Sequence, residues 1–129
     1  MSLPTLSATE HGLGTELAHA IAAQDAAALR GLLSTPVTFR AVTPRRFWDA
    51  DTAVGVADVI LGVWFGPDKH VTGVTSLATD SVGDVHKVSY RLRVDLDSGP
   101  AVIEQVVYYT QKDDQINDLR LVCSGFRPI

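Results

Sequence analysis

Residues 86–109, HKVSYRLRVDLDSGPAVIEQVVYY, decide the fold because they carry the clearest strand pattern in the chain. From residue 87 to residue 96 polar and apolar side chains alternate, which is typical of a β-strand with one buried face. A turn signal follows at residues 97–100, and the next run, 101–111, is rich in β-branched and aromatic residues. The stretch therefore predicts an antiparallel hairpin. The buried face of its first strand carries Val88, Tyr90, Leu92, Val94 and Leu96.

The register of this hairpin is expected to follow from a two-residue loop at Ser98-Gly99. That loop places Arg93 opposite Glu104, an opposite-charge pair of the kind that stabilises neighbouring strands. It also places Leu92 opposite Gln105 on the buried face.

The predicted buried face is apolar apart from the Gln105 amide and the phenols of Tyr90 and Tyr109. A buried amide without a partner costs about 1–3 kcal/mol, so Gln105 needs a protein group, a water or a ligand. Two interpretations stay open: a core glutamine bonded to a neighbour, or a side chain that faces a ligand. The two tyrosines have the same two interpretations, as core rings or as ligand contacts.

Helical patterns precede this hairpin. The capping-box spacing of Ser7 and Glu10 predicts a helix over 8–24, followed by a short second helix that Asp25 caps and that ends near Leu33. A strand is predicted over 37–43, which Pro44 ends. A loop with Phe47 and Trp48 leads to a third helix, which Asp51 or Thr52 caps and Gly66-Pro67 terminates.

The second half of the chain predicts a four-stranded meander at about 69–79, 85–97, 101–111 and 116–124. Ile116 and Leu119 have opposite parity in the last strand, which predicts a bulge near Asn117-Asp118. The element order is α-α-β-α-β-β-β-β. It predicts an α+β fold with the helices on one side of a curved, mostly antiparallel sheet.

The composition limits the class of protein. With 129 residues, 46% hydrophobic and 20% charged, we expect a single domain over 1–129, with 1–7 as a flexible N-terminus. A net charge of −4 with scattered basic residues argues against nucleic-acid binding. One cysteine and four histidines without paired spacing argue against a metal site. No apolar run reaches membrane-spanning length and no secretion signal is visible, so we expect a cytoplasmic protein without a membrane segment.

The outward face of the hairpin carries an unusual number of apolar side chains. Val102, Val106 and Tyr108 lie there among charged residues, and no predicted helix is left to cover them. We therefore expect a homodimer through this outer sheet face, with a merely solvated sheet as the alternative.

The segment from Asp25 through Leu29, Leu32 and Leu33 to Val37 and Phe39, followed by a helix and a meander, resembles the nuclear transport factor 2-like superfamily. The turn at residues 113–116, Asp-Asp-Gln-Ile, stands where that superfamily commonly has an acidic residue, a glycine, a lysine and an isoleucine. The resemblance covers about 8–126. It implies the cone-shaped α+β barrel fold, with a pocket between the third helix, the loop before it and the inner sheet face.

Members of this superfamily include ketosteroid isomerases, SnoaL-like cyclases, dehydratases, epoxide hydrolases and non-catalytic domains, so the fold does not choose the function. The sequence predicts a cofactor-free protein that binds a small organic molecule. Its expected ligand-binding residues are Phe39, Trp48, Tyr90, Gln105 and Tyr109. Trp48 has an alternative interpretation as a hydrophobic plug over the core.

Two other functions stay open. An isomerase, cyclase or dehydratase would take its proton-transferring residue from Asp118, His70 or Asp51. A non-catalytic dimerisation module would need only the outer face. Under the expected register no carboxylate points inward, and Asp118 would do so only if the bulge lay beyond it. Cys123 and Trp64 are interpreted as core residues.

Overall fold

The computed structural model describes residues 3–129, with side chains from residue 12 onward. Three helical regions and seven strands occur over this range. The helices are α1 (Leu3–Ala22), α2 (Ala26–Gly31) and α3 (Ala53–Ala57), which continues into the π-helix η1 (Asp58–Trp64). The strands are β1 (Leu33–Thr43), β2 (Arg46–Ala50), β3 (His70–Val82), β4 (Val85–Leu96), β5 (Gly99–Lys112), β6 (Gln115–Cys123) and β7 (Arg127–Pro128).

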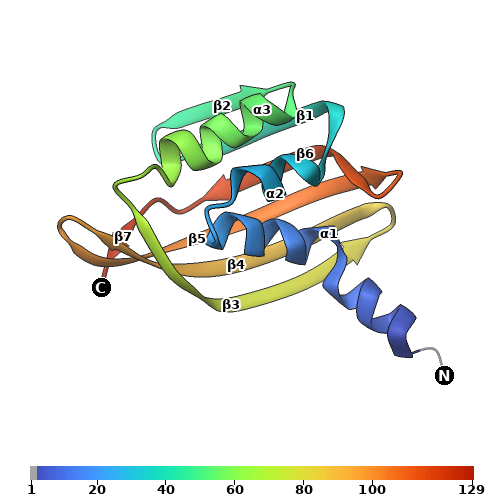
Figure 1. Ribbon diagram of the computed structural model, residues 1–129, viewed down its shortest axis with the longest axis horizontal. Coiled ribbons are helices and arrows are strands. Elements are labelled where there is room, and N and C mark those ends of the chain that lie inside the picture. The colour runs from blue at the N-terminus through green and yellow to red at the C-terminus, as the bar shows by residue number, and fades with distance from the viewer. Residues whose placement is uncertain (1–2) are drawn as a thin grey trace.

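All strands belong to one curved sheet (Figure 1). Its order is β2-β1-β6-β5-β4-β3, with β7 paired to β5, and every pairing is antiparallel except that of β1 with β6. The helices lie on the concave side of the sheet, where α1 packs against β3 and β4 while α3 packs against β1 and β2. The α+β prediction is confirmed. No helix within residues 3–129 is long and apolar enough to cross a membrane.

The predicted helix caps at Asp25 and Thr52 are confirmed. Asp25 accepts a hydrogen bond from the Ala28 amide at 3.0 Å, and Thr52 accepts one from the Gly55 amide at 2.9 Å. These bonds satisfy amides that the first turn of a helix leaves without partners.

The ends of the first two helices differ from the prediction. α1 begins at Leu3 rather than residue 8 and is kinked at Gly12, whose φ of 40° lies outside the helical region. The expected flexible segment 1–7 and the Ser7–Glu10 capping contact lie outside the residues whose side chains are described. The second helix ends at Gly31, so Leu33 opens β1 instead of closing the helix. Leu33 is nevertheless buried, as it would also have been at the end of a helix packed on the core.

Residues 46–50 form the strand β2, so the prediction of a loop there was wrong. β2 pairs with the end of β1 across a turn in which Arg45 has a φ of 75°. Trp48 and Ala50 turn toward the core while Phe47 is 83% exposed. The strand was missed because it is only five residues long and two of its five side chains are charged.

The hairpin between β4 and β5 is shifted from the expected register. Leu96 pairs with Gly99, so the two-residue loop is Asp97-Ser98 rather than Ser98-Gly99. Gly99 uses its positive φ of 126° at the first paired position and not inside the loop. The expected Arg93–Glu104 and Leu92–Gln105 pairs were therefore wrong. A shift of two pairing positions leaves every side chain on its predicted face.

The correct pairing brings Arg91 opposite Glu104 and Tyr90 opposite Gln105. In the neighbouring strand the predicted bulge is confirmed at Asn117. Gln111 pairs with Ile116 and Thr110 with Asp118, which leaves Asn117 as the extra residue.

The side chain of Gln24 holds the first two helices to the segment that follows η1. Its Nε2 donates to the carbonyl oxygens of Phe65 at 3.1 Å and Lys69 at 2.8 Å, and its Oε1 accepts from the Val71 amide at 3.1 Å. These bonds fix the end of the third helical region against the start of β3.

Candidate functional site

A series of buried hydrogen bonds, which we call the polar chain, crosses the inner face of β4, β5 and β6. The Tyr90 hydroxyl donates to Gln105 Oε1 at 2.7 Å, and Gln105 Nε2 donates to Cys123 Sγ at 3.3 Å. The Gly125 amide also donates to Cys123 Sγ, at 3.4 Å. Gln105 is only 1% exposed, and both ends of its amide therefore have protein partners. This geometry fits the interpretation of Gln105 as a core glutamine bonded to its neighbours.

The ionisation of Tyr90 is suppressed by this environment. Burial is the main cause that raises the pKa of its hydroxyl far above the usual value, and the neighbouring Cys123 thiol adds to the shift. Tyr90 is thus a neutral hydrogen-bond donor at physiological pH, not a proton-transferring base.

Tyr109 lies on the same face, where α1 meets the sheet. Its Oη accepts a hydrogen bond from the Gly14 amide at 2.8 Å, and its ring stacks on His86 at a centroid distance of 5.1 Å. Burial raises the pKa of the Tyr109 hydroxyl. A β-carbon on Gly14 would lie 2.9 Å from the Tyr109 ring, so this contact requires glycine. Tyr109 therefore anchors α1 to the sheet.

Phe39 and Trp48 are brought together by Trp64 at the end of η1. The Trp64 ring lies 6.2 Å from the Phe39 ring and 5.9 Å from the Trp48 ring, the latter edge to face. We call these three residues the aromatic cluster. Trp48 donates its indole N–H to Thr43 Oγ1 at 2.8 Å, while its outward side carries the Arg46 guanidinium 3.8 Å from the ring centroid. The five predicted site residues therefore lie in three places. Tyr90 and Gln105 belong to the polar chain, and Tyr109 contacts α1. Phe39 and Trp48 belong to the aromatic cluster.

The three candidate proton-transferring residues are all outside the core. His70 and Asp51 are exposed, and Asp118 points outward because the bulge at Asn117 precedes it. Asp118 lies 3.7 Å from the Arg120 guanidinium. Within residues 12–129 the buried polar side chains other than tyrosine, tryptophan and cysteine are Thr15 and Gln105, and neither is ionisable. In this part of the chain no group of three or more His, Cys, Asp or Glu residues is placed to hold a metal ion.

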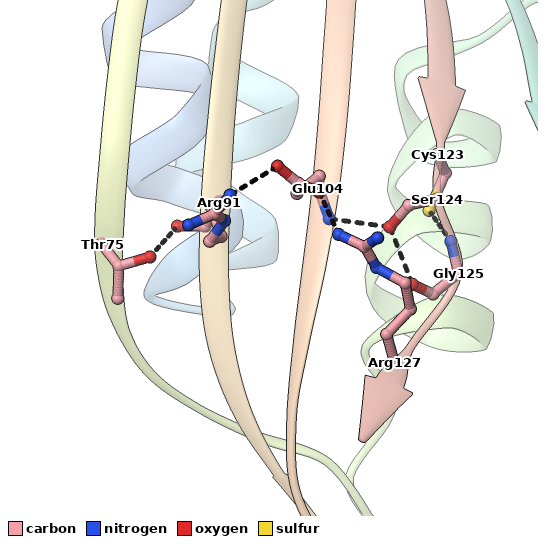
Figure 2. A network of polar contacts seen from close by, with 7 residues as sticks. All are labelled: Thr75, Arg91, Glu104, Cys123, Ser124, Gly125 and Arg127. Atoms are coloured by element: carbon pink, nitrogen blue, oxygen red, sulfur yellow. Dashed lines mark hydrogen bonds and ion pairs between the residues drawn. The ribbon is translucent and has the colours of Figure 1, made fainter. Parts of the chain in front are cut away.

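The outer side of the sheet carries charge where the inner side has none. Figure 2 shows Glu104 between two guanidinium groups, those of Arg91, at 3.0 Å, and Arg127. The Glu104 amide donates to Ser124 Oγ at 2.9 Å. The hydrogen bond from Arg91 is the main cause that holds the pKa of the Glu104 carboxyl below its usual value, and Arg127 contributes. This network ties β7 and β4 to β5.

Beside this network the outer face is hollowed into a groove of about 360 Å³ across β2, β1, β6 and β5, which we call the outer groove. Arg40 and Arg120 are paired on adjacent strands at its floor. The groove gathers several of the exposed large apolar side chains of residues 12–129, namely Val42, Phe47, Tyr108 and Val122. The sequence predicted an apolar outer face. It did not predict the part around Phe47, because that part depends on the pairing of β2 with β1.

The interpretation of Trp64 as a core residue is confirmed, since it is 6% exposed within the hydrophobic core. Its position at the end of an apolar helical stripe is that of an ordinary core residue. Its contacts with Phe39 and Trp48 depend on β2 and on the π-helical turn, neither of which the sequence pattern predicts.

Comparison with known proteins finds likeness in structure alone. No protein-family model matches the chain, and no curated protein matches it in sequence. A protein of ketosteroid isomerase-like fold from Catenulispora acidiphila, solved in complex with trimethylamine, has a TM-score of 0.67 and 15% identity. The match covers 87% of this chain and 85% of that one.

Two further structures have a similar fold. An LEH-like epoxide hydrolase from M. tuberculosis has a TM-score of 0.64 at 9% identity, over 87% of this chain and 80% of that chain. LinA has a TM-score of 0.64 at 14% identity, over 98% and 90%. The chain therefore has the cone-shaped α+β fold of the nuclear transport factor 2-like superfamily, as the sequence resemblance implied.

Proposed function

We propose that this chain binds a small, largely apolar organic molecule on the inner face of its sheet, without a cofactor. The binding residues in this proposal are Phe39, Trp48, Tyr90, Gln105 and Tyr109. The observation that carries it is the character of the inner face: aromatic side chains, one amide and two phenols, with no charged side chain buried within residues 12–129. Small-molecule sites are commonly apolar walls with a few polar groups that orient the ligand.

Binding is favoured over catalysis by the placement of the ionisable groups. General acid–base chemistry needs a titratable side chain within hydrogen-bond reach of the substrate. His70 and Asp51 are exposed, Asp118 lies partly exposed on the outer side of the sheet, and the Tyr90 hydroxyl is held neutral. An isomerase, cyclase or dehydratase of this fold would need a base that the inner face of residues 12–129 does not supply.

The first experiment asks whether the protein holds a ligand. The purified protein is extracted with organic solvent and the extract analysed by mass spectrometry, and uncharged aromatic and alicyclic compounds are then tested for an increase in Tm. We expect a bound compound or a Tm increase that saturates with concentration. An empty protein whose Tm no compound raises would contradict the proposal and leave the dimerisation module as the function.

Two adjacent residues of β2 provide a matched pair of variants. Trp48→Phe should weaken binding, because this ring contacts Trp64 in the aromatic cluster. Phe47→Ala changes the neighbouring side chain, which is 83% exposed and points to the outer groove. Binding that responds equally to both variants would place the ligand elsewhere.

We also propose a homodimer through the outer sheet face, in a cytoplasmic protein. The support is the set of exposed apolar side chains in the outer groove, since contiguous exposed apolar surface commonly marks an interface. Val122→Arg should convert the dimer to a monomer in light scattering. Val82→Arg is the control, because Val82 is an exposed valine at the far end of β3. An unchanged mass for Val122→Arg, or a monomeric parent protein, would exclude this interface.

A further inference from the structure

The indole N–H of Trp64 is buried without a hydrogen-bond partner. Trp64 is 6% exposed, and its Nε1 is the one buried side-chain nitrogen or oxygen within the described residues that lacks a partner. The other tryptophan differs, because Trp48 donates its N–H to Thr43. Buried polar groups in folded proteins nearly always have partners, and one that has none needs an explanation.

No acceptor in the part of the chain that the structure describes lies within hydrogen-bond distance of Trp64 Nε1. The rings closest to it in the aromatic cluster are those of Phe39 and Trp48, whose own N–H is already engaged. The buried polar side chains of residues 12–129 include Gln105, whose oxygen accepts from Tyr90, and Thr15 on α1. The free N–H is therefore a donor in an apolar environment, where a hydrogen bond is strong and an unmade one is unfavourable.

The backbone at Trp64 is also unusual. Trp64 ends the π-helix η1, and the Phe65 amide donates to the Ile60 carbonyl at 2.9 Å, five residues back along the chain. π-Helical turns are rare and occur frequently at functional sites. The Gln24 side chain binds the Phe65 carbonyl, so the position of Trp64 is fixed from the following residue.

We propose that the Trp64 indole N–H donates a hydrogen bond to an acceptor oxygen of the bound molecule, and that this molecule is uncharged. This inference rests on the proposed binding function and names the group that orients the ligand. The ligand is uncharged because no charged side chain is buried within residues 12–129 to compensate an ion. Trp64 thus determines specificity: it favours a carbonyl, ether or hydroxyl over a hydrocarbon of the same shape.

The test compares ketones with alkenes of the same skeleton, such as acetophenone with α-methylstyrene and 2-tetralone with its exocyclic methylene analogue. Each pair differs in one acceptor oxygen. The parent protein should bind the ketone about 5-fold more tightly, the value of one ordinary hydrogen bond. In Trp64→Phe, which keeps an aromatic ring but has no donor, the preference should disappear. Phe47→Ala is the control and should keep it.

A second measurement follows the parent protein, and the variants serve only to assign its signals. The two tryptophans give two indole N–H resonances in a ¹⁵N-labelled sample, and loss of one signal in Trp48→Phe or Trp64→Phe assigns them. On ketone binding the Trp64 proton should move downfield, as a newly hydrogen-bonded N–H does, and the alkene should not move it downfield.

The outcomes separate this inference from the proposed function. If ketones and alkenes bind with equal affinity, or the Trp64 resonance does not move downfield when a ketone binds, the inference fails while binding stands. If no compound of either series changes the Tm or either indole signal, the proposed function fails and the inference with it.

Discussion

Replacing Gln105 with leucine tests whether the polar chain on the inner face stabilises the fold. In the folded protein Gln105 accepts from the Tyr90 hydroxyl at 2.7 Å and donates to Cys123 Sγ at 3.3 Å. Leucine removes the acceptor and leaves the Tyr90 hydroxyl buried without a partner, at a cost of about 1–3 kcal/mol. The loss of the bond to Cys123 adds little, because a thiol is a weak acceptor and keeps the Gly125 amide.

The double variant Gln105→Leu/Tyr90→Phe makes the prediction specific. Tyr90→Phe alone leaves the Gln105 oxygen without its donor and should also cost about 1–3 kcal/mol. In the double variant both polar partners are gone and the site is apolar, so its total loss should be smaller than the sum of the single losses. We expect a coupling energy of about 1–3 kcal/mol.

The assay is urea unfolding followed by tryptophan fluorescence and circular dichroism at pH 7, with thermal unfolding as a second measure. For a chain of 129 residues a loss of 1 kcal/mol corresponds to a Tm decrease of about 4 °C, so each single variant should lose about 4–12 °C. If the loss in the double variant equals the sum of the two single losses, the hydrogen bond between Tyr90 and Gln105 contributes no coupling energy. An unchanged or increased stability of Gln105→Leu alone would assign the amide to a ligand instead.

Three further predictions concern the helices and the outer face. Gln24→Ala removes three hydrogen bonds to the segment after η1, so it should cost about 2–3 kcal/mol and speed amide exchange there. Gly14→Ala should destabilise by about 1–3 kcal/mol because its β-carbon would lie 2.9 Å from the Tyr109 ring, whereas Gly62→Ala, with open space around it, should not destabilise the protein; thermal unfolding compares them. The Glu104 pKa is lowered by its arginine partners, so its contribution is present above the usual glutamate pKa and lost as the pH falls through the folded value. The stability advantage of the parent protein over Glu104→Gln should therefore shrink between pH 7 and pH 3, and an advantage that grows toward low pH would contradict the assigned ion pairs.

The faces of the sheet were predictable from the sequence because a face depends only on the parity of a residue in its strand. Val88, Tyr90 and Leu92 are buried as expected, although the hairpin is shifted relative to the expected register. The shift spans two pairing positions, and the side-chain period of a strand is also two, so the error cancels for burial. The bulge at Asn117 was predictable for the same reason, since it restores the parity of Ile116 and Leu119.

The cross-strand partners were not predictable in this way. Which residue faces Gln105 depends on the loop, and whether Gly99 lies in the loop or in the first pair is decided by backbone geometry that Asp97-Ser98-Gly99 does not specify. The expected register put Gln105 opposite leucine and left its amide unexplained. The observed register puts it opposite Tyr90, which supplies the missing donor.

The same distinction governs the function. The nonpolar character of the inner face follows from periodicity, and so does the outward placement of the carboxylates. The two polar groups that bear on the proposed binding depend on individual contacts: the Gln105 amide has its partners within the protein, and the Trp64 N–H has none. A donor left free in an apolar environment is unfavourable for the empty protein and favourable for a complex with an acceptor. The orienting group of the site is therefore expected at Trp64, on the helical side, and not at the glutamine on the sheet to which the sequence first drew attention.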